Sequence, residues 1–223
     1  MPSPPWTLEQ YGRELMDYTP PVQCPVSSSH LNRVRNSITA ASWALLEIFR
    51  DLELLDAVRA EVDGCVAASS DGRISFDIGQ LLRLPILQAV YAETLRLRMH
   101  FYIVRMTDRA DLRVRDWIVP RRKAIVTLTT VAHMDGDLWS TGPNNEHPLD
   151  QFWVGRFLGD ASRAQGQART EGSDASPLFS IKDHEGSWIP YGGGPRQCPG
   201  RHFAKRQIFL TVALFIKIGR AHV

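Results

Sequence analysis

A cysteine between a glycine-rich turn and the start of a helix is the feature that most constrains this chain. The segment reads Tyr191-Gly-Gly-Gly-Pro-Arg-Gln-Cys198-Pro-Gly200. Glycine supplies the backbone angles of a tight turn and proline fixes one of them. An apolar stripe with proline in the first turn predicts a helix from Pro199 to Lys217. Because the positive end of a helix dipole favours thiolate over thiol, the segment is suited to presenting one sulfur anion.

The sulfur of Cys198 has several possible partners. A zinc site would pair Cys198 with His202, but no second Cys/His pair completes four ligands. A nucleophilic cysteine needs a base and an orienting group, and the sequence singles out neither. A phosphate-binding loop would end in Gly-Lys-Ser/Thr, and a dinucleotide site would need glycine where Gln197 stands. A buried structural cysteine remains open. Haem iron, which can take a cysteine thiolate as fifth ligand, fits best.

The same segment resembles the haem-binding signature of the cytochrome P450 superfamily, Phe-x-x-Gly-x-Arg-x-Cys-x-Gly, with Tyr191 in place of the phenylalanine. The resemblance implies haem as the cofactor and Cys198 as the axial ligand of its iron. It also implies that Arg196 pairs with a haem propionate and that Gly200 lets the helix pass close to the porphyrin. Tyr191 and Gly192 are expected to belong to the same cofactor-binding turn.

Two helices are predicted upstream. Apolar residues at helical spacing indicate a helix from Leu31 to Arg50. Asp51 is a plausible N-cap for a second helix that reaches Asp63, and Gly64 ends it.

The first of these helices resembles the C-terminal part of the family's long distal helix. Arg35-Asn36-Ser37-Ile38-Thr39 lies where the family has Ala-Gly-x-Asp/Glu-Thr. The resemblance implies that the Thr39 hydroxyl helps deliver protons to bound oxygen, while Ile38 replaces the acid. The next residues are close to the variant of the sterol 7-alpha-hydroxylase and prostacyclin-synthase-like branch, which makes Asn36 a second candidate catalytic residue. The alternative is that Asn36 and Thr39 only cap or back-bond the helix.

A third helix is predicted to start at Pro85 and carries Glu93 and Arg96 on one face. Such a pair is usually a solvated surface pair of little consequence. Here it resembles the family's Glu-x-x-Arg helix. The segment from Phe152 to Phe157, which contains Arg156, resembles the family's Phe-x-Pro-Glu-Arg-Phe segment. The resemblance therefore implies an internal triad of Glu93, Arg96 and Arg156 whose role is folding.

Short strands are predicted at Phe101–Arg105, Leu112–Val114 and Ala124–Leu128, which are rich in β-branched and aromatic residues. Arg105 matches an arginine of the family that reaches a haem propionate, a role that suits a guanidinium. A solvent-facing arginine is the alternative. His133 is interpreted as a loop residue and not as a ligand.

These elements predict a mainly α fold with small β-sheets, an α+β class that corresponds to the C-terminal portion of the P450 fold. Residues 1–30 are rich in proline and serine and are expected to be irregular. Residues 31–217 are expected to form the C-terminal half of a P450 domain. Residues 218–223 break the apolar pattern at Gly219 and are expected to be a non-native tail that packs against nothing.

Composition excludes some classes of function. The net charge is only +2, from 26 basic and 24 acidic residues, so charge gives no case for nucleic-acid binding. Three scattered cysteines argue against a disulfide framework and fit a reducing compartment. The sequence shows no secretory signal or membrane span, which leaves the location of this chain undetermined. The resemblance implies an intact parent at the endoplasmic reticulum membrane, facing the cytoplasm, with its anchor in an N-terminal part absent here.

The resemblance implies a haem-thiolate monooxygenase that inserts one oxygen atom from O2 into an apolar small molecule, with electrons from an NADPH-dependent reductase or another donor. Arg201, Lys205 and Arg206 would offer that donor a basic surface, unless they are an ordinary solvated helix face. A haem-thiolate isomerase or dehydratase that needs no external electrons is an alternative, and the loss of the acid at Ile38 leans that way. A non-enzymatic truncated fragment is another, and this chain alone is expected to have little or no activity.

Overall fold

The computed structural model describes residues 29–67, 74–159 and 178–219. Its helices are α2 (Ser29–Arg50), α3 (Leu52–Asp63), α4 (Ile78–Leu81), α5 (Pro85–Arg98), α6 (Thr129–His133) and α8 (Arg201–Ile218), with 3-10 helices η1 (Val154–Phe157), η2 (Lys182–His184) and η3 (Gly194–Arg196). Its strands are β1 (Val66–Ala67), β2 (Ser75–Phe76), β3 (Tyr102–Met106), β4 (Leu112–Val114), β5 (Trp117–Val119), β6 (Ala124–Leu128), β7 (Leu158–Gly159) and β8 (Leu178–Phe179).

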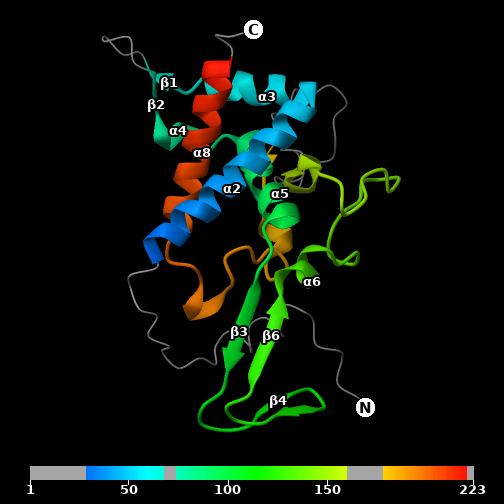
Figure 1. The fold of residues 1–223 in the computed structure, drawn as a ribbon. Coiled ribbons are helices and arrows are strands. Elements are labelled where there is room, and N and C mark those ends of the chain that lie inside the picture. The colour runs from blue at the N-terminus through cyan, green and yellow to red at the C-terminus, as the bar shows by residue number, and fades with distance from the viewer. Residues whose placement is uncertain (1–28, 68–73, 160–177, 220–223) are drawn as a thin grey trace.

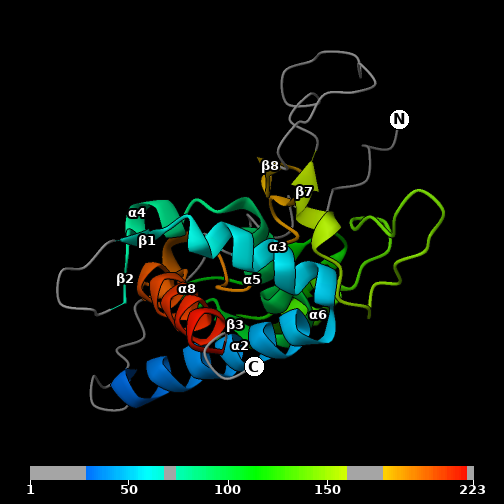
Figure 2. The ribbon, with the colours of Figure 1, turned by 90° about the horizontal axis from the view of Figure 1, so that it is seen from above.

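The core lies between the longer helices. Helix α2 packs against α8, α5 and α3, and α3 also touches α5 and α8 (Figures 1 and 2). Apolar side chains from all of these helices are buried together: Ala40, Ala44, Ile48, Val58, Val62, Leu87, Val90, Ile208, Phe209 and Val212. This helical layer carries the segments on which the candidate site is built.

The ends of α3 follow the sequence signals. The Asp51 carboxylate accepts a hydrogen bond from the Leu54 amide at 3.1 Å, which satisfies one of the free amides of the first turn. At the other end, the amide of Gly64 donates to the Val62 carbonyl. The predicted N-cap and the predicted end of this helix are both confirmed.

Helix α5 begins at Pro85, as predicted, and receives its cap from another helix. The carboxylate of Glu61 in α3 accepts hydrogen bonds from the amides of Ile86 at 2.9 Å and Leu87 at 3.0 Å. Burial raises the pKa of Glu61, and these two hydrogen bonds oppose that rise. No local pattern predicts this cap, because it joins residues of two different helices.

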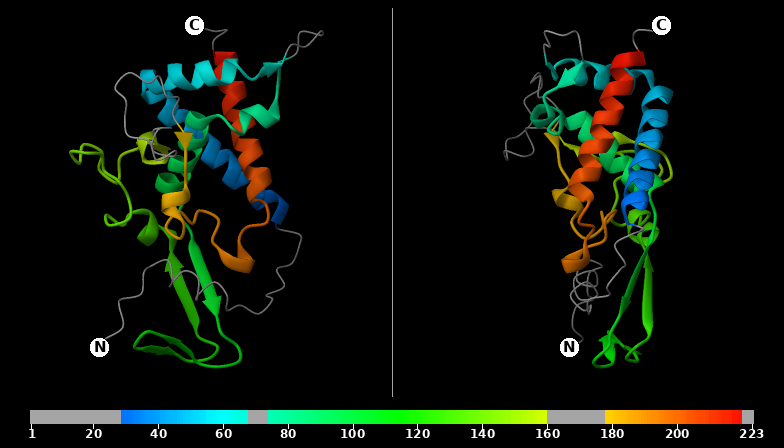
Figure 3. Two further views of the ribbon diagram at one scale, coloured as in Figure 1. Left: turned by 180° about the vertical axis from the view of Figure 1, so that it is seen from behind. Right: turned by 60° about the vertical axis from the view of Figure 1, so that its left-hand side comes forward.

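The sheets are small and antiparallel. Strands β3 and β6 form a ribbon in which Tyr102 pairs with Leu128 and Arg105 with Ile125. The ribbon extends away from the helices and ends in the β4–β5 hairpin (Figures 1 and 3). The three predicted strands are confirmed, with β3 shifted by one residue to Tyr102–Met106, and the α+β class is as expected. Strands β1, β2, β5, β7 and β8 were not predicted.

Some expectations differ from the structure in detail, and others concern residues that the structure does not describe. His133 is not a loop residue: it is the last residue of α6 and is fully buried. Helix α8 begins at Arg201, two residues after the expected Pro199, and continues to Ile218, one residue past its expected end. Helix α2 begins at Ser29, two residues before the expected Leu31. Residues 1–28 and 220–223, which hold most of the expected irregular start and of the expected tail, lie outside the described residues.

Candidate functional site

The segment of residues 191–200 before α8, called the Cys198 turn below, is closed by backbone hydrogen bonds. The Cys198 amide donates to the Tyr191 carbonyl at 3.0 Å, and the Gln197 amide donates to the Gly194 carbonyl at 3.0 Å. Gly192 and Gly194 have φ angles of +69° and +63°, which glycine adopts without the penalty that other residues meet. The free thiol of Cys198 is partly exposed. The glycines predicted to make the turn therefore hold the cysteine just ahead of the helix.

The segment that leads into this turn is attached to helices α5 and α6. Trp188 donates from its indole nitrogen Nε1 to the Ala92 carbonyl at 3.0 Å. The Ile189 amide donates to Nε2 of His133 at 3.1 Å. The approach to the cysteine is thus held by hydrogen bonds to residues far away in the sequence.

His133 can accept that bond because it is neutral. Burial lowers the pKa of His133 to about 3, and the neighbouring His100 and Arg96 lower it further in the same direction. An uncharged imidazole carries one acceptor nitrogen, and here that nitrogen faces the Ile189 amide. His133 is therefore a structural support of the turn, which agrees with the expectation that it is not a ligand.

A pair of tyrosines joins the turn to α5. The hydroxyl of Tyr191 lies 2.7 Å from the hydroxyl of Tyr91, and either can be the donor. Burial is the main reason that the pKa of both phenols is raised, and the charge of Cys198 adds to the rise in each. Both phenols therefore lie within the electrostatic reach of the cysteine.

Two arginines expected to bind the cofactor lie close to each other. Burial lowers the pKa of Arg105, and the positive charge of Arg196 lowers it further. Arg105 donates from Nη1 to the Val104 carbonyl at 2.9 Å, while its buried Nε has no hydrogen-bond partner among the described residues. Arg196 is exposed at the end of η3. The structure thus brings together two cations from β3 and from the cysteine turn, as an anion-binding site requires.

The candidate catalytic residues Asn36 and Thr39 lie on α2. Both side chains are exposed, as is Ile38 between them, whereas Ser37 and Ala40 are buried in the helical layer. The first turns of α2 and the segment that leads to α8 lie at the same end of the helical layer (Figures 1 and 3). Asn36 and Thr39 are therefore on an accessible face in the N-terminal half of α2.

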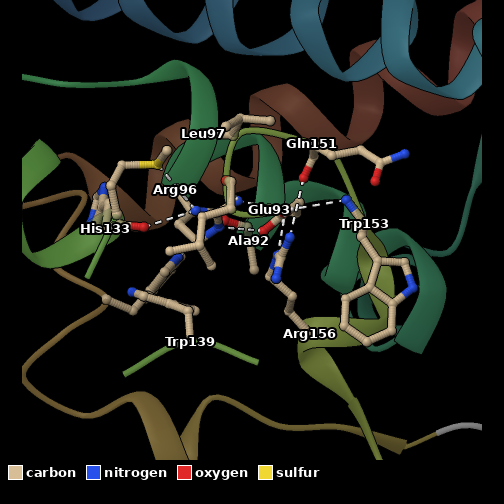
Figure 4. A network of polar contacts seen from close by, with 12 residues as sticks. Ala92, Glu93, Arg96, Leu97, His133, Trp139, Gln151, Trp153 and Arg156 are labelled. Atoms are coloured by element: carbon tan, nitrogen blue, oxygen red, sulfur yellow. Dashed lines mark hydrogen bonds and ion pairs between the residues drawn. The ribbon is translucent and has the colours of Figure 1, made fainter. Parts of the chain in front are cut away.

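The predicted triad of Glu93, Arg96 and Arg156 forms in the interior of the protein (Figure 4). Arg96 donates from Nε and Nη2 to the two carboxylate oxygens of Glu93 at 2.7 and 2.9 Å. Arg156 donates from Nε to Glu93 Oε1 at 3.2 Å. The side chains of all three residues have no exposed surface. The spatial arrangement expected for Glu93, Arg96 and Arg156 is confirmed.

Each arginine of the triad also donates hydrogen bonds to backbone carbonyls. Arg96 donates to the carbonyls of His133 at 2.8 Å and Leu149 at 2.7 Å. Arg156 donates to four carbonyls of the segment that precedes η1: Ser140, His147, Pro148 and Gln151. A buried ion pair is tolerated when further hydrogen bonds satisfy its remaining donors. The triad therefore fixes the irregular segment between α6 and η1.

The expected basic face of α8 is only partly available. The Lys205 ammonium lies 5.3 Å from the ring centre of Phe209 and donates to Gln88 at 3.0 Å, and burial lowers its pKa. Arg201 donates from Nη1 to the Cys198 carbonyl at 3.2 Å. Of the three expected residues, only Arg206 is classed as exposed. Lys205 therefore belongs to the packing of α8 and not to a free docking surface.

Sequence reasoning missed Tyr91 and the support given by His133. Tyr191 carried a usable signal, because a hydroxyl where the resembling family has phenylalanine requires a partner if it is buried. The identity of that partner, 100 residues away, could not be read from the sequence. For His133 no local signal distinguished a supporting residue from a loop histidine.

Comparison with known proteins identifies the family of the matched segment. A family model described as cytochrome P450 matches residues 34–218. The cytochrome P450 monooxygenase efuG of Hormonema carpetanum is 39% identical, over 81% of this chain and 34% of that protein. The monooxygenase fsoE of Humicola fuscoatra is 36% identical (81% and 33%), and calL of Penicillium decumbens is 35% identical (81% and 31%).

These relatives refine two expectations. The chain spans about a third of the length of the curated relatives it matches. The relatives are fungal P450 monooxygenases, and they give no support to the sterol 7-alpha-hydroxylase and prostacyclin-synthase-like branch. In the part of the chain that the structure describes, no helix is long and apolar enough to cross a membrane.

Proposed function

The chain belongs to the cytochrome P450 family, and on that premise we propose that the whole protein is a haem-thiolate monooxygenase acting on an apolar organic molecule. Haem is the cofactor of this family, and its members use a redox partner and a small-molecule substrate. The observation that carries the proposal is the closed turn that holds Cys198 just ahead of α8. Cys198 is proposed as the axial ligand of the haem iron.

The residues present fit a haem. Haem carries two propionate carboxylates, and the positive charges of Arg105 and Arg196 act on each other. The buried Nε of Arg105 has no hydrogen-bond partner in the part of the chain that the structure describes. A carboxylate between the two guanidiniums would remove their mutual repulsion and satisfy that donor. The partly exposed thiol of Cys198 supplies the soft anionic ligand that iron accepts. The donor set therefore suits the group that the family binds.

When bound, a haem with a thiolate ligand supplies the chemistry of oxygen activation. The chain's own residues position the group and handle protons. The Cys198 turn, with Tyr191, Gly192 and Gly200, holds the sulfur, while Arg105 and Arg196 orient the carboxylates. The Thr39 hydroxyl and the Asn36 amide are proposed to hold a proton donor on the exposed face of α2.

The finer assignments belong to this proposal as well. An NADPH-dependent reductase or another electron donor is the proposed redox partner, and the endoplasmic reticulum membrane is the proposed location of the whole protein. The sterol 7-alpha-hydroxylase-like branch is not carried forward, because the relatives have other names. No contact in the described residues favours an isomerase or dehydratase over the monooxygenase that those names suggest.

Product analysis of the whole protein, with and without an electron donor, tests the proposed reaction. With haem, O2, a reductase and NADPH, an apolar substrate should gain one oxygen atom, and 18O from labelled O2 should appear in the product. Omission of the reductase should abolish the product. Turnover that continues without electrons would contradict the monooxygenase and support the isomerase or dehydratase.

A further inference from the structure

The hydrogen bond between Tyr91 and Tyr191 links the cysteine turn to the helical core. The two hydroxyl oxygens are 2.7 Å apart. Only 6% of Tyr91 is exposed, and Tyr191 is half-buried. A buried hydroxyl that loses its partner costs about 1–3 kcal/mol. Each tyrosine therefore satisfies the other.

The Tyr91 side chain is held in place from several sides. Its ring meets Phe209 edge-on at 5.5 Å between centroids and Trp188 edge-on at 6.4 Å. The Lys205 ammonium lies 5.7 Å from the ring centre. Aromatic edge contacts and a nearby cation favour one ring orientation. The Tyr91 hydroxyl is therefore held at a fixed position on α5, where Tyr191 can bind it.

Tyr191 connects that fixed point to the cysteine. Its side chain bonds to Tyr91, and its backbone carbonyl accepts the Cys198 amide at 3.0 Å. Loss of the hydroxyl contact would release Tyr191 and weaken the bond that closes the turn.

We propose that the Tyr91–Tyr191 hydroxyl pair is a positioning device that holds the Cys198 turn against α5 and thereby fixes the place of the Cys198 sulfur. Phenylalanine would fill the space of either ring, but it would supply no polar link. The pair is a property of the chain itself. Only the use of the sulfur as a haem ligand rests on the proposed function.

Amide hydrogen exchange at Cys198 in the chain without haem tests the link directly. Tyr191→Phe and Tyr91→Phe should each accelerate exchange of the Cys198 amide by about tenfold, since each removes one buried hydrogen bond and leaves one hydroxyl unpaired. The double variant also lacks the hydrogen bond that links the turn to α5, so it should exchange about as fast as the single variants. Tyr102→Phe, at an exposed tyrosine of β3, is the matched control and should change nothing.

Two results would overturn the proposal at this stage. One is unchanged exchange of the Cys198 amide in both single variants. The other is an equal acceleration at amides of α2, which would show a general loss of stability and no specific effect on the turn.

A spectroscopic measurement then asks whether the pair fixes the sulfur. In the haem-loaded chain, each single variant should lower the fraction of the ferrous carbon monoxide complex that shows a thiolate-type band. The double variant, which lacks the same link, should lower that fraction to a similar extent. An unchanged thiolate fraction in the single variants would overturn the positioning role. If the unmodified chain takes up no haem, the proposed function fails for this chain, while the exchange result still decides the link between the tyrosines.

Discussion

The guanidinium of Arg105 lies close enough to that of Arg196 for the two positive charges to repel, and this repulsion adds to burial in lowering the pKa of Arg105. The two residues come from β3 and η3, segments about 90 positions apart in the sequence. An arrangement that brings like charges together is unfavourable unless an anion joins them. This repulsion supports the proposal that the two arginines bind a carboxylate of the haem.

Substitution Arg105→Gln should therefore weaken the binding of haem without lowering the stability of the haem-free chain. Haem affinity should fall roughly tenfold or more, because a charge-assisted hydrogen bond contributes about 1.5–3 kcal/mol. The free energy of unfolding without haem should stay within about 0.5 kcal/mol or rise, since one of two repelling charges is gone. Haem titration and denaturant unfolding of the same variant measure the two effects. A variant that loses haem only because it unfolds would contradict this assignment.

Substitution Glu93→Gln should lower the stability of the folded chain. Removing the carboxylate leaves Arg96 and Arg156 buried with less compensation, which costs about 3–5 kcal/mol. Denaturant unfolding measures the loss. Glu185→Gln, at an exposed glutamate of the same chain, is the control and should stay within about 0.5 kcal/mol. A Glu93→Gln chain as stable as the control would show that the triad does not stabilise the fold.

Much of this arrangement could be predicted from local signals. The Asp51 cap and the Pro85 start depend on residues whose types and positions are distinctive along the sequence. The triad followed only from the resemblance, because the local spacing of Glu93 and Arg96 is equally typical of a surface pair. The resemblance to a known signature suggested the role of Cys198 as a ligand of haem iron. The juxtaposition of Arg105 and Arg196 followed only through that resemblance.

The contacts that sequence reasoning missed are all between distant elements. The Glu61 cap of α5 joins residues 25 and 26 positions apart, and the tyrosine pair spans 100. Periodicity and capping rules use only the few residues around each position. They therefore cannot predict which distant residues come into contact. The sequence pattern around His133 does not predict a helix, because α6 has only five residues and no strong apolar stripe.

Stability should fall in acid because of His133. Its pKa in the folded chain is about 3, against 6.5 for the free side chain, so the unfolded chain binds the proton first as the pH falls. The stabilisation is complete above about pH 6.5 and is lost progressively towards pH 3, at up to about 1.4 kcal/mol per pH unit. His133→Gln should flatten this part of the profile of unfolding free energy against pH. The exposed His202→Gln serves as the control. Parallel profiles for the unmodified chain and His133→Gln would refute the role of this histidine.

Substitution Gly155→Ala should disturb the segment that carries Arg156. A Cβ atom at Gly155 would lie 2.4 Å from ring atoms of Trp153, so the indole would have to move. The amide of Trp153 donates to Glu93, and its ring lies 5.3 Å from the Arg156 guanidinium, so the movement would reach the triad. We expect a loss of about 1–3 kcal/mol in unfolding free energy.

Gly136→Ala is a matched control for that substitution, because a Cβ atom at Gly136 would meet nothing within 4 Å. The control should keep its unfolding free energy within about 0.5 kcal/mol. Equal effects of the two alanines in thermal or denaturant unfolding would mean that the contact with Trp153 does not constrain Gly155.

The carbon monoxide spectrum of the reduced, haem-loaded chain tests the role of Cys198 most directly. A thiolate ligand to the iron predicts a red-shifted absorption band that is present in the unmodified chain and absent in Cys198→Ala. Cys65→Ala, which removes the buried cysteine at the end of α3, should keep the band. A histidine-type band in the unmodified chain, or a thiolate-type band that survives Cys198→Ala, would contradict the assignment of Cys198 as the axial ligand.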